Sequence, residues 1–425
     1  MAFINVNVIP MTGDDVLPAQ TVVVDNGIIV TVGAVGDTAV PDDAYIVDGT
    51  DRYLIPGLVE MHGHVAGSGS ANLDRILTLY VVNGVTTVRG MLGQPSHLTM
   101  RAQIASGELL GPRLITSGPS LNGSSVASPE AGVAMVLEQH AAGYDFLKIH
   151  PGLSREEFDA IAASANEVGI PFAGHVPEDV GLERALAAGI ATIDHLDGYM
   201  QALLKPNEDV SGGLSGFFGV FLADMADESM ISAIARATAD AGVWNVPTEA
   251  LFHHVTAPDV SPDMLADRKE MKYMPAENVA QWHDAKSDLM ADASYIPSTA
   301  ARAIEIRKQL ILALHEVGAG LLLGSDSPQI FNVPGFALHH ELDFIVQAGL
   351  TPLEALKTGT INTAKFFGLD DKFGSVREGL QADLVLLDAN PLSDIRNTTR
   401  IHGVMLKGRW LSRNDLDELL AAYER

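Results

Sequence analysis

The sequence contains no cysteine, and this absence excludes disulfides, thiolate metal sites and a cysteine nucleophile. Any metal site must therefore be built from nitrogen and oxygen ligands. Basic residues are also scarce, since 27 lysines and arginines stand against 54 aspartates and glutamates. The formal net charge is −27 and no basic stripe occurs, so the sequence predicts no nucleic-acid partner. The acidic excess indicates either a well-hydrated surface or a field that attracts cationic substrates.

Long apolar runs are absent as well. No run reaches the roughly 18 to 20 residues that a membrane-spanning helix needs. Residues 1–15 lack the basic segment followed by an apolar segment that marks a secretory signal. The sequence therefore predicts a cytoplasmic protein with no membrane association.

The middle of the chain alternates between apolar strands and helical segments. Eight short segments rich in β-branched or apolar residues are predicted as strands: 54–64, 85–90, 113–117, 145–150, 171–176, 190–195, 243–248 and 320–326. Alternating strands and helices imply a parallel sheet, and eight such units favour a closed (β/α)8 TIM barrel. The expected fold class is α/β.

Both ends of the chain show a different pattern. Short alternating strands without an intervening helix are predicted near the two termini: 3–8, 21–24, 27–32, 45–48, 384–388 and 403–407. We therefore expect a small β-sandwich domain formed by residues 1–52 plus 372–425, ending in a helix over 413–425. The barrel itself is expected over residues 53–371.

Two stretches, 199–225 and 249–299, exceed ordinary loop lengths. The second follows the seventh predicted strand, and the loops after barrel strands face the active site. We interpret residues 249–299 as a partly helical lid. The alternative is an insertion without a role at the site.

Several polar residues stand where the predicted strands end. His62 and His64 flank one glycine, and side chains two apart in a strand point to the same face. His175 and His195 end the fifth and sixth strands, and Asp326 ends the eighth. Each residue alone could instead be an ordinary structural histidine or, for Asp326, a helix cap. Five such residues at equivalent strand ends favour a shared site.

Lys148 is unusual because it stands in the middle of a predicted buried strand. Burial depresses the pKa of a lysine, and the neutral amine can add carbon dioxide to form a carbamate. Such a carbamate could bridge two cations; the alternative is a lysine paired with Asp or Glu. His150 has the same strand parity and is expected to face inward, as a supporting or substrate contact.

The combined pattern resembles the binuclear sites of the amidohydrolase superfamily. The segments YLIPGLV at 53–59 and GSVREGLQADLVLLD at 374–388 also resemble conserved parts of that superfamily. Because Lys148 is present, the chain is most similar to the imidazolonepropionase-like branch with prolidase-like dipeptidases, carboxypeptidases acting on C-terminal Arg or Lys, and ochratoxin-type amidases. The resemblance implies a metal-dependent hydrolase that acts on C–N bonds.

The resemblance also implies a set of ligands. His62, His64 and Asp326 would hold one divalent metal ion, and His175 and His195 would hold the other. Carboxylated Lys148 and a hydroxide would bridge the two ions. Zinc fits these ligands best, with manganese or cobalt as alternatives. Asp326 would act as the catalytic acid–base group.

Four further residues, chosen for their places near strand ends or in the presumed lid, are predicted substrate contacts: Arg89, Tyr199, His253 and His254. His339, His340 and Glu341 are predicted to be structural. No nucleophile elbow, phosphate-binding loop or zinc-protease motif occurs in the sequence.

The expected reaction is hydrolysis of an amide or peptide bond in a small-molecule substrate, either a dipeptide or an N-acyl amino acid. Hydrolysis of a lactone, a carbamate or a phosphotriester at the same site is the alternative. A non-catalytic scaffold of the same fold is the most distant alternative. The pattern leaves open whether copies of the chain form a homo-oligomer.

Overall fold

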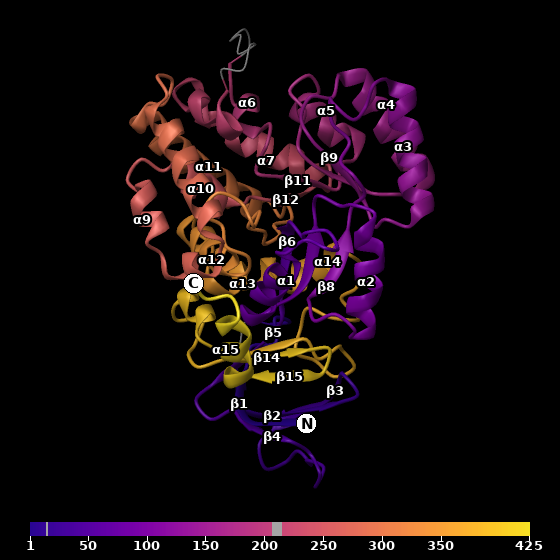
Figure 1. Cartoon of the computed structure of the whole chain (residues 1–425), viewed down its shortest axis with the longest axis vertical. Helices are drawn as coiled ribbons and strands as arrows, with labels where there is room; N and C mark the ends of the chain where they lie inside the picture. The colour runs from indigo at the N-terminus through magenta and orange to yellow at the C-terminus, as the bar shows by residue number, and fades with distance from the viewer. Residues whose placement is uncertain (14–15, 206–214) are drawn as a thin grey trace.

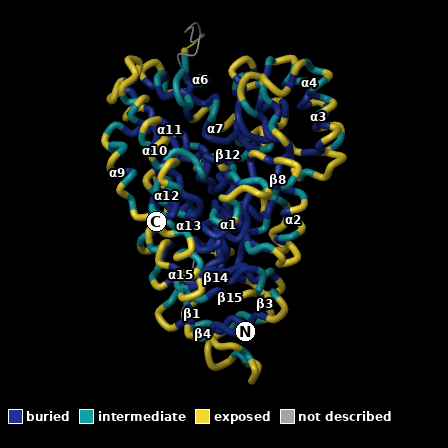
Figure 2. The backbone as a smooth tube through the Cα atoms, in the orientation of Figure 1, coloured by how far each residue is buried: buried dark blue, intermediate teal, exposed yellow. Residues whose placement is uncertain are grey.

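The computed structural model describes residues 1–13, 16–205 and 215–425. A core of parallel strands lies between helices in one part of the molecule, and a separate sheet formed by both chain ends lies at the opposite end (Figure 1). Buried residues follow the strands, whereas exposed residues are concentrated on the outer helices and loops (Figure 2). Each helix among the described residues is too short or too polar to traverse a lipid bilayer.

Seven regular parallel strands form the core: β6 (Leu58–Gly63), β7 (Val85–Gly90), β8 (Arg113–Thr116), β9 (Leu147–Ile149), β10 (Phe172–Gly174), β11 (Thr192–Asp194) and β12 (Trp244–Val246). Strands β6, β7 and β8 form one parallel sheet, and β9 to β12 form a second. All of these strands are buried along most of their length, as parallel strands covered by helices must be.

Parallel bridges join the two sheets into a ring. Ser117, just after β8, pairs with Phe146 beside β9. On the other side, residues 320–326 are extended and bonded to both flanking strands, because Asn245 pairs with Leu321 and the Met61 N–H donates to the Leu323 carbonyl. The eighth predicted strand therefore closes the barrel through isolated bridges instead of a regular ladder. The expected α/β fold class is confirmed.

Helices follow the barrel strands and cover their outer faces: α1 (Leu73–Val82), α2 (Ser96–Ser106), α3 (Pro129–Ala142), α4 (Arg155–Val168), α5 (Gly181–Ala188), α6 (Tyr199–Ala202), α7 (Ile231–Asp240), α11 (Pro297–Glu316), α12 (Phe336–Gln347), α13 (Pro352–Thr358) and α14 (Ile361–Phe366). Local sequence sets their ends. In α4, for example, the Ser154 and Glu157 side chains form a capping box, worth about 1 kcal/mol, and Gly169 ends the helix at φ 75°.

The two long stretches are largely folded. Residues 249–299 contain α8 (Glu249–Thr256), α9 (Pro262–Ala266), a 3-10 helix η3 (Lys269–Tyr273) and α10 (Ala276–Ala291). Residues 199–225 contain α6 and the 3-10 helix η1 (Phe217–Met225), followed by η2 (Glu228–Met230), while positions 206–214 lie outside the described residues. A lid role for 249–299 stays a prediction.

Both chain ends contribute to one eight-stranded sheet, which contains β1 (Ala2–Val8), β2 (Leu17–Asp25), β3 (Ile28–Ala34), β4 (Ile46–Asp48), β5 (Tyr53–Pro56), β13 (Leu384–Leu387), β14 (Ile401–Leu406) and β15 (Arg409–Ser412). Its order is β15-β14-β13-β5-β1-β2-β3, with β4 paired to β1. Residues of β1 and β2 pack against β13 and β14 in one apolar cluster. A short 3-10 helix η4 (Ile395–Thr399) precedes β14, and the final helix α15 is Arg413–Ala421. The domain boundaries at 52 and 372 stay predictions.

The contact between α8 and α12 contains a buried carboxyl group. Glu341 is fully buried, and its Oε2 accepts a hydrogen bond from the Ala250 N–H at 2.6 Å. Burial first, and the neighbouring Glu249 second, raise the pKa of Glu341 well above its usual value of 4.5. The folded protein therefore holds this proton above pH 4.5 and the unfolded chain releases it, so the free energy of unfolding decreases as the pH rises.

We expect Glu341→Gln to remove this loss of stability. The melting temperature of the variant minus that of the parent should therefore be higher at pH 8 than at pH 5. Thermal denaturation with saturating metal measures this difference. Glu305→Gln, on the exposed surface of α11, is the matched control for a lost carboxylate. A Glu341→Gln difference that is the same at both pH values would contradict the prediction.

Candidate active site

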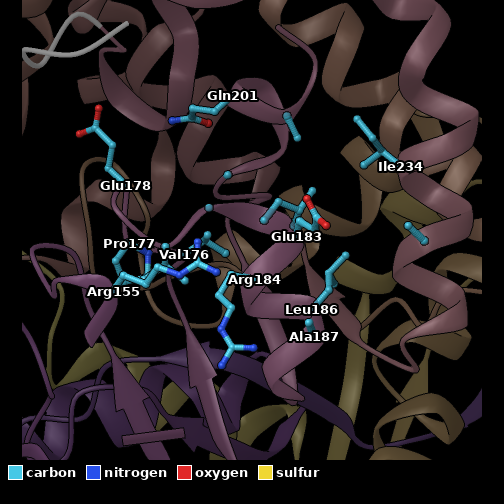
Figure 3. A pocket seen from close by; sticks show the side chains of 16 residues that line it. Arg155, Val176, Pro177, Glu178, Glu183, Arg184, Leu186, Ala187, Gln201 and Ile234 are labelled. Atoms are coloured by element: carbon cyan, nitrogen blue, oxygen red, sulfur yellow. The ribbon is translucent and has the colours of Figure 1, made fainter. Parts of the chain in front are cut away.

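A cavity of about 250 Å³ lies where the barrel strands end. It is lined by His62, His64, His150, His175, His195, Phe217, Phe218, Leu251, Asp326, Gln329 and Ile330. A larger groove, of about 810 Å³, lies elsewhere, between α5, α6 and α7, and is lined by residues such as Glu183, Gln201 and Ile234 (Figure 3). None of the predicted metal ligands lines this groove, so the smaller cavity is the candidate site.

Three of the predicted ligands form a compact group. The Nε2 atom of His64 lies 2.6 Å from Oδ1 of Asp326, and the Nε2 atom of His62 lies 3.7 Å from the same oxygen. One potential ligand atom from each of the three residues falls within 4.8 Å of the others. His62 lies on β6 and Asp326 follows the extended segment that closes the barrel against β6. This group can hold one metal ion.

The other two histidines adjoin this group. The ring centroids of His175 and His195 are 4.7 Å apart, and those of His195 and His62 are 4.5 Å apart. The Nδ1 atom of His195 lies 3.7 Å from Oδ2 of Asp326. Four imidazoles from the ends of β6, β10 and β11 therefore share one cavity with a single carboxylate.

Lys148 lies on β9, fully buried, and its Nζ has no hydrogen-bond partner among the described residues. The direct partner that a structural ion pair requires is thus missing. Burial lowers the pKa of Lys148 to about 8, although Asp194 and Asp326 oppose this shift. A Cβ atom at Gly174 would lie 3.1 Å from Nζ and 2.5 Å from the Ile149 carbonyl, so glycine before His175 leaves room for the lysine.

Asp194 is a supporting residue that the sequence interpretation missed. Its Oδ2 lies 2.7 Å from Nδ1 of His62, which orients the opposite ring nitrogen toward the metal-binding group. Arg89 donates to both oxygens of Asp194 at 3.2 Å and, through Nε, to the Met61 carbonyl at 2.6 Å. Arg89 is buried and does not line the cavity, so the structure places it behind the candidate ligands and not at the predicted substrate contact.

The other two histidines have similar partners. Asp197 lies 3.0 Å from Nδ1 of His175, and the Thr248 hydroxyl lies 2.9 Å from Nδ1 of His195. His195, Thr248 and Asp326 all have positive φ angles, of 65°, 53° and 57°. Such backbone conformations are uncommon for these residue types and cluster at functional sites. They let the His195 and Asp326 side chains turn into the cavity and place the Thr248 hydroxyl beside His195.

Two buried charged groups fix the strand ends from outside the cavity. Arg307 of α11 donates to the His195 carbonyl at 2.8 Å and to the Pro247 carbonyl at 3.0 Å, and its Nε donates to Glu249 at 2.8 Å. Glu60 accepts from the His62 and Ser325 N–H groups, both at 2.9 Å. Burial raises the pKa of Glu60 to about 8, although these hydrogen bonds oppose the shift.

Of the predicted substrate contacts, only His150 lines the cavity. Its ring stacks on His175 with a centroid distance of 4.9 Å. Burial first, and the charge of Lys148 second, lower the pKa of His150 to about 3. Tyr199 is instead fully buried, and its hydroxyl donates to Asn245 at 2.7 Å. The substrate prediction for Tyr199 is therefore corrected to a role in the core.

The two lid histidines also lie away from the cavity lining. Nδ1 of His254 is 2.7 Å from Oδ1 of Asn332, and Nε2 of His254 is 2.6 Å from the Arg268 guanidinium. His253 packs on the Phe344 ring at 4.6 Å. Their helix α8 directs both side chains toward α12 and the loop after Ser325, so the substrate predictions for His253 and His254 are corrected as well.

A sequence profile of the amidohydrolase family matches residues 53–411. The chain belongs to the amidohydrolase family. Amidohydrolases are hydrolytic enzymes that bind divalent metals and act on C–N bonds. The family membership that the sequence motifs predicted is therefore confirmed.

Individual amidohydrolases resemble the chain over most of its length. Ochratoxinase from Aspergillus niger is 25% identical over 374 residues, which cover 81% of this chain and 72% of that one. Imidazolonepropionase from Idiomarina loihiensis is 21% identical over 420 residues, covering 92% of each. The crystal structure of a putative prolidase from Bifidobacterium longum superposes with a TM-score of 0.71 at 25% identity, covering 100% of this chain and 98% of that one.

Proposed function

We propose that this amidohydrolase cleaves an amide bond in a small substrate with the help of two divalent metal ions. The observation that carries the proposal is the unpartnered, buried Lys148 amine beside a cavity that holds four histidines and one aspartate. Nitrogen and oxygen donors of this kind suit zinc best, and manganese or cobalt less well. Ochratoxinase and prolidase, as named relatives, support amide or peptide hydrolysis.

The candidate metal ligands form two groups, and Lys148 would serve both. His62, His64 and Asp326 would hold one ion, and His175 and His195 the other. The neutral Lys148 amine would add carbon dioxide, forming an N–C bond and releasing one proton, and the resulting carbamate would supply two further oxygen ligands for the ions. The absence of a hydrogen-bond partner for Nζ among the described residues fits this modification.

When bound, divalent ions lower the pKa of coordinated water and polarise a carbonyl group. The chain itself would move the proton. Burial alone would raise the pKa of Asp326, but the adjacent His62 and His64 outweigh burial and lower it, so the side chain is an ionised carboxylate at neutral pH. Asp326 would take this proton from the attacking water and give it to the amide nitrogen as the C–N bond breaks. The products are a carboxylic acid and an amine.

A cavity of about 250 Å³ at the candidate ligands suits a small substrate. Dipeptides and N-acyl amino acids are the first candidates. The test combines metal analysis of the gently purified protein with a screen of amides, esters, lactones, carbamates and phosphotriesters. We expect about two metal ions per chain and turnover of amides. Less than one ion per chain, or turnover of esters or lactones with no amide cleaved, would reject the proposal.

A further inference from the structure

The walls of the cavity are apolar apart from the candidate metal ligands and a few neutral groups. Four of the lining residues are hydrophobic: Phe217, Phe218, Leu251 and Ile330. Phe218 stacks on His195 with a centroid distance of 4.6 Å and an interplanar angle of 12°, and Phe217 lies 4.3 Å from Phe218. Gln329 is a neutral polar lining residue. Lysine and arginine are absent from the described residues that line the cavity.

The positions outside the described residues, 14–15 and 206–214, contain no lysine or arginine. Cations around the site are already engaged: Arg89 with Asp194, Arg307 with Glu249, Arg268 with His254, and Lys286 with the His254 and Ala257 carbonyls. Once Lys148 is carboxylated, as proposed above, none of these cationic side chains is free to receive a substrate carboxylate.

We propose that the substrate is an uncharged amide that carries a bulky apolar group and no free carboxylate. The inference rests on the proposed function and narrows it, because it favours blocked amides over free dipeptides and free N-acyl amino acids. An aromatic or branched aliphatic group would pack against Phe217, Leu251 and Ile330. A carboxylate in the same place would lie near Asp326 without a partner, and an unpaired or like charge there is unfavourable.

The proposed metal ions would not serve as a productive partner for a substrate carboxylate. A carboxylate that reached them would occupy the place that the amide carbonyl needs for hydrolysis. Free acids would therefore bind unproductively at the ions or unfavourably against the wall, whereas an uncharged amide can present its carbonyl and bury its apolar group together.

The direct test uses two amides that differ only in the carboxylate: N-benzoylphenylalanine and N-benzoylphenethylamine. Each is cleaved to benzoate and an amine. We expect the uncharged amide to have a kcat/KM about ten-fold or more above that of the acid, about 1.4 kcal/mol. Equal turnover of the two compounds, or faster turnover of the acid, would overturn the inference.

A charge introduced into the wall should change this preference. Gln329→Arg is expected to raise the kcat/KM of the acid relative to the uncharged amide by about ten-fold, because the guanidinium would pair with the carboxylate. Gln347→Arg makes the same substitution on the exposed surface of α12 and should leave the ratio unchanged. An equal effect of both variants would show that net charge, rather than the cavity wall, decides the preference.

A binding experiment separates this inference from the proposed function. The benzenesulfonamides of phenylalanine and of phenethylamine contain no amide bond to cleave, and their affinity for the metal-loaded protein can be measured by calorimetry. Tighter binding of the uncharged compound supports the inference even if no amide is turned over, in which case the proposed function alone fails. Tighter binding of the acid contradicts the inference.

Discussion

Lys148→Ala is expected to abolish turnover. The proposed carbamate would contact both metal ions. Its removal should therefore decrease activity by more than the roughly 10- to 100-fold seen when an outer partner of a metal ligand is removed. Metal content should fall in parallel. Because the lysine is fully buried next to Gly174, the alanine variant leaves a void that a small anion can enter. Added formate, acetate or propionate should therefore restore part of the activity and of the metal content.

Lys148→Met is the matched control, since it fills most of the same volume and cannot form a carbamate. It should be as inactive as the alanine variant but insensitive to added carboxylates. Thermal denaturation of both variants identifies any loss of fold. Full activity in Lys148→Ala would reject the bridging role. Equal rescue of the two variants would show that the carboxylates act somewhere other than the void.

The strand ends that carry the candidate ligands could be predicted because strand periodicity is local. His62 and His64 share a parity, and a regular spacing of strands brought His175 and His195 to the same end of the barrel. The eighth strand was harder, since residues 320–326 form only isolated bridges. Its apolar pattern predicted its position correctly but contained no signal for this irregular pairing.

The supporting residues could not be predicted in the same way. Asp194 precedes His195, and regular strand parity would point the two side chains to opposite faces. The positive φ angle of 65° at His195 breaks that parity, so Asp194 reaches His62 while His195 still enters the cavity. A local sequence pattern contains no signal for this backbone conformation. The adjacent carboxylate and histidine were nevertheless visible in the sequence.

The errors among the substrate contacts have one physical cause. Tyr199 was chosen because it follows a strand end, and His254 because it lies early in the presumed lid. Their helices turn both side chains toward partners that are distant in sequence, Asn245 and Asn332. Position along the chain sets which end of the barrel a residue is near, and helix orientation sets where its side chain points. The aromatic wall around Phe217 and Phe218 had a visible signal, since both stand in a glycine-rich stretch of unusual length.

Asp326→Asn is expected to abolish turnover while preserving the local backbone. Asparagine has nearly the same shape as aspartate and tolerates the left-handed conformation that residue 326 adopts at φ 57°. The variant therefore isolates the loss of charge and of proton transfer. In the parent, Nε2 of His64 lies 2.6 Å from Oδ1 of Asp326, and the asparagine side chain would still lie next to this nitrogen. However, no group would carry the proton from water to the leaving nitrogen. The decrease should appear in kcat, measured at saturating metal and substrate.

Asp197→Asn provides the comparison. Asp197 contacts Nδ1 of His175 at 3.0 Å, accepts from the Val176 N–H at 3.3 Å and does not line the cavity, so its replacement should reduce activity by roughly 10- to 100-fold, mainly through weaker metal binding. Added metal should recover much of the activity of Asp197→Asn and none of the activity of Asp326→Asn. If excess metal restored both variants equally, Asp326 would be a ligand alone, and the proton would have to travel through another group in the cavity.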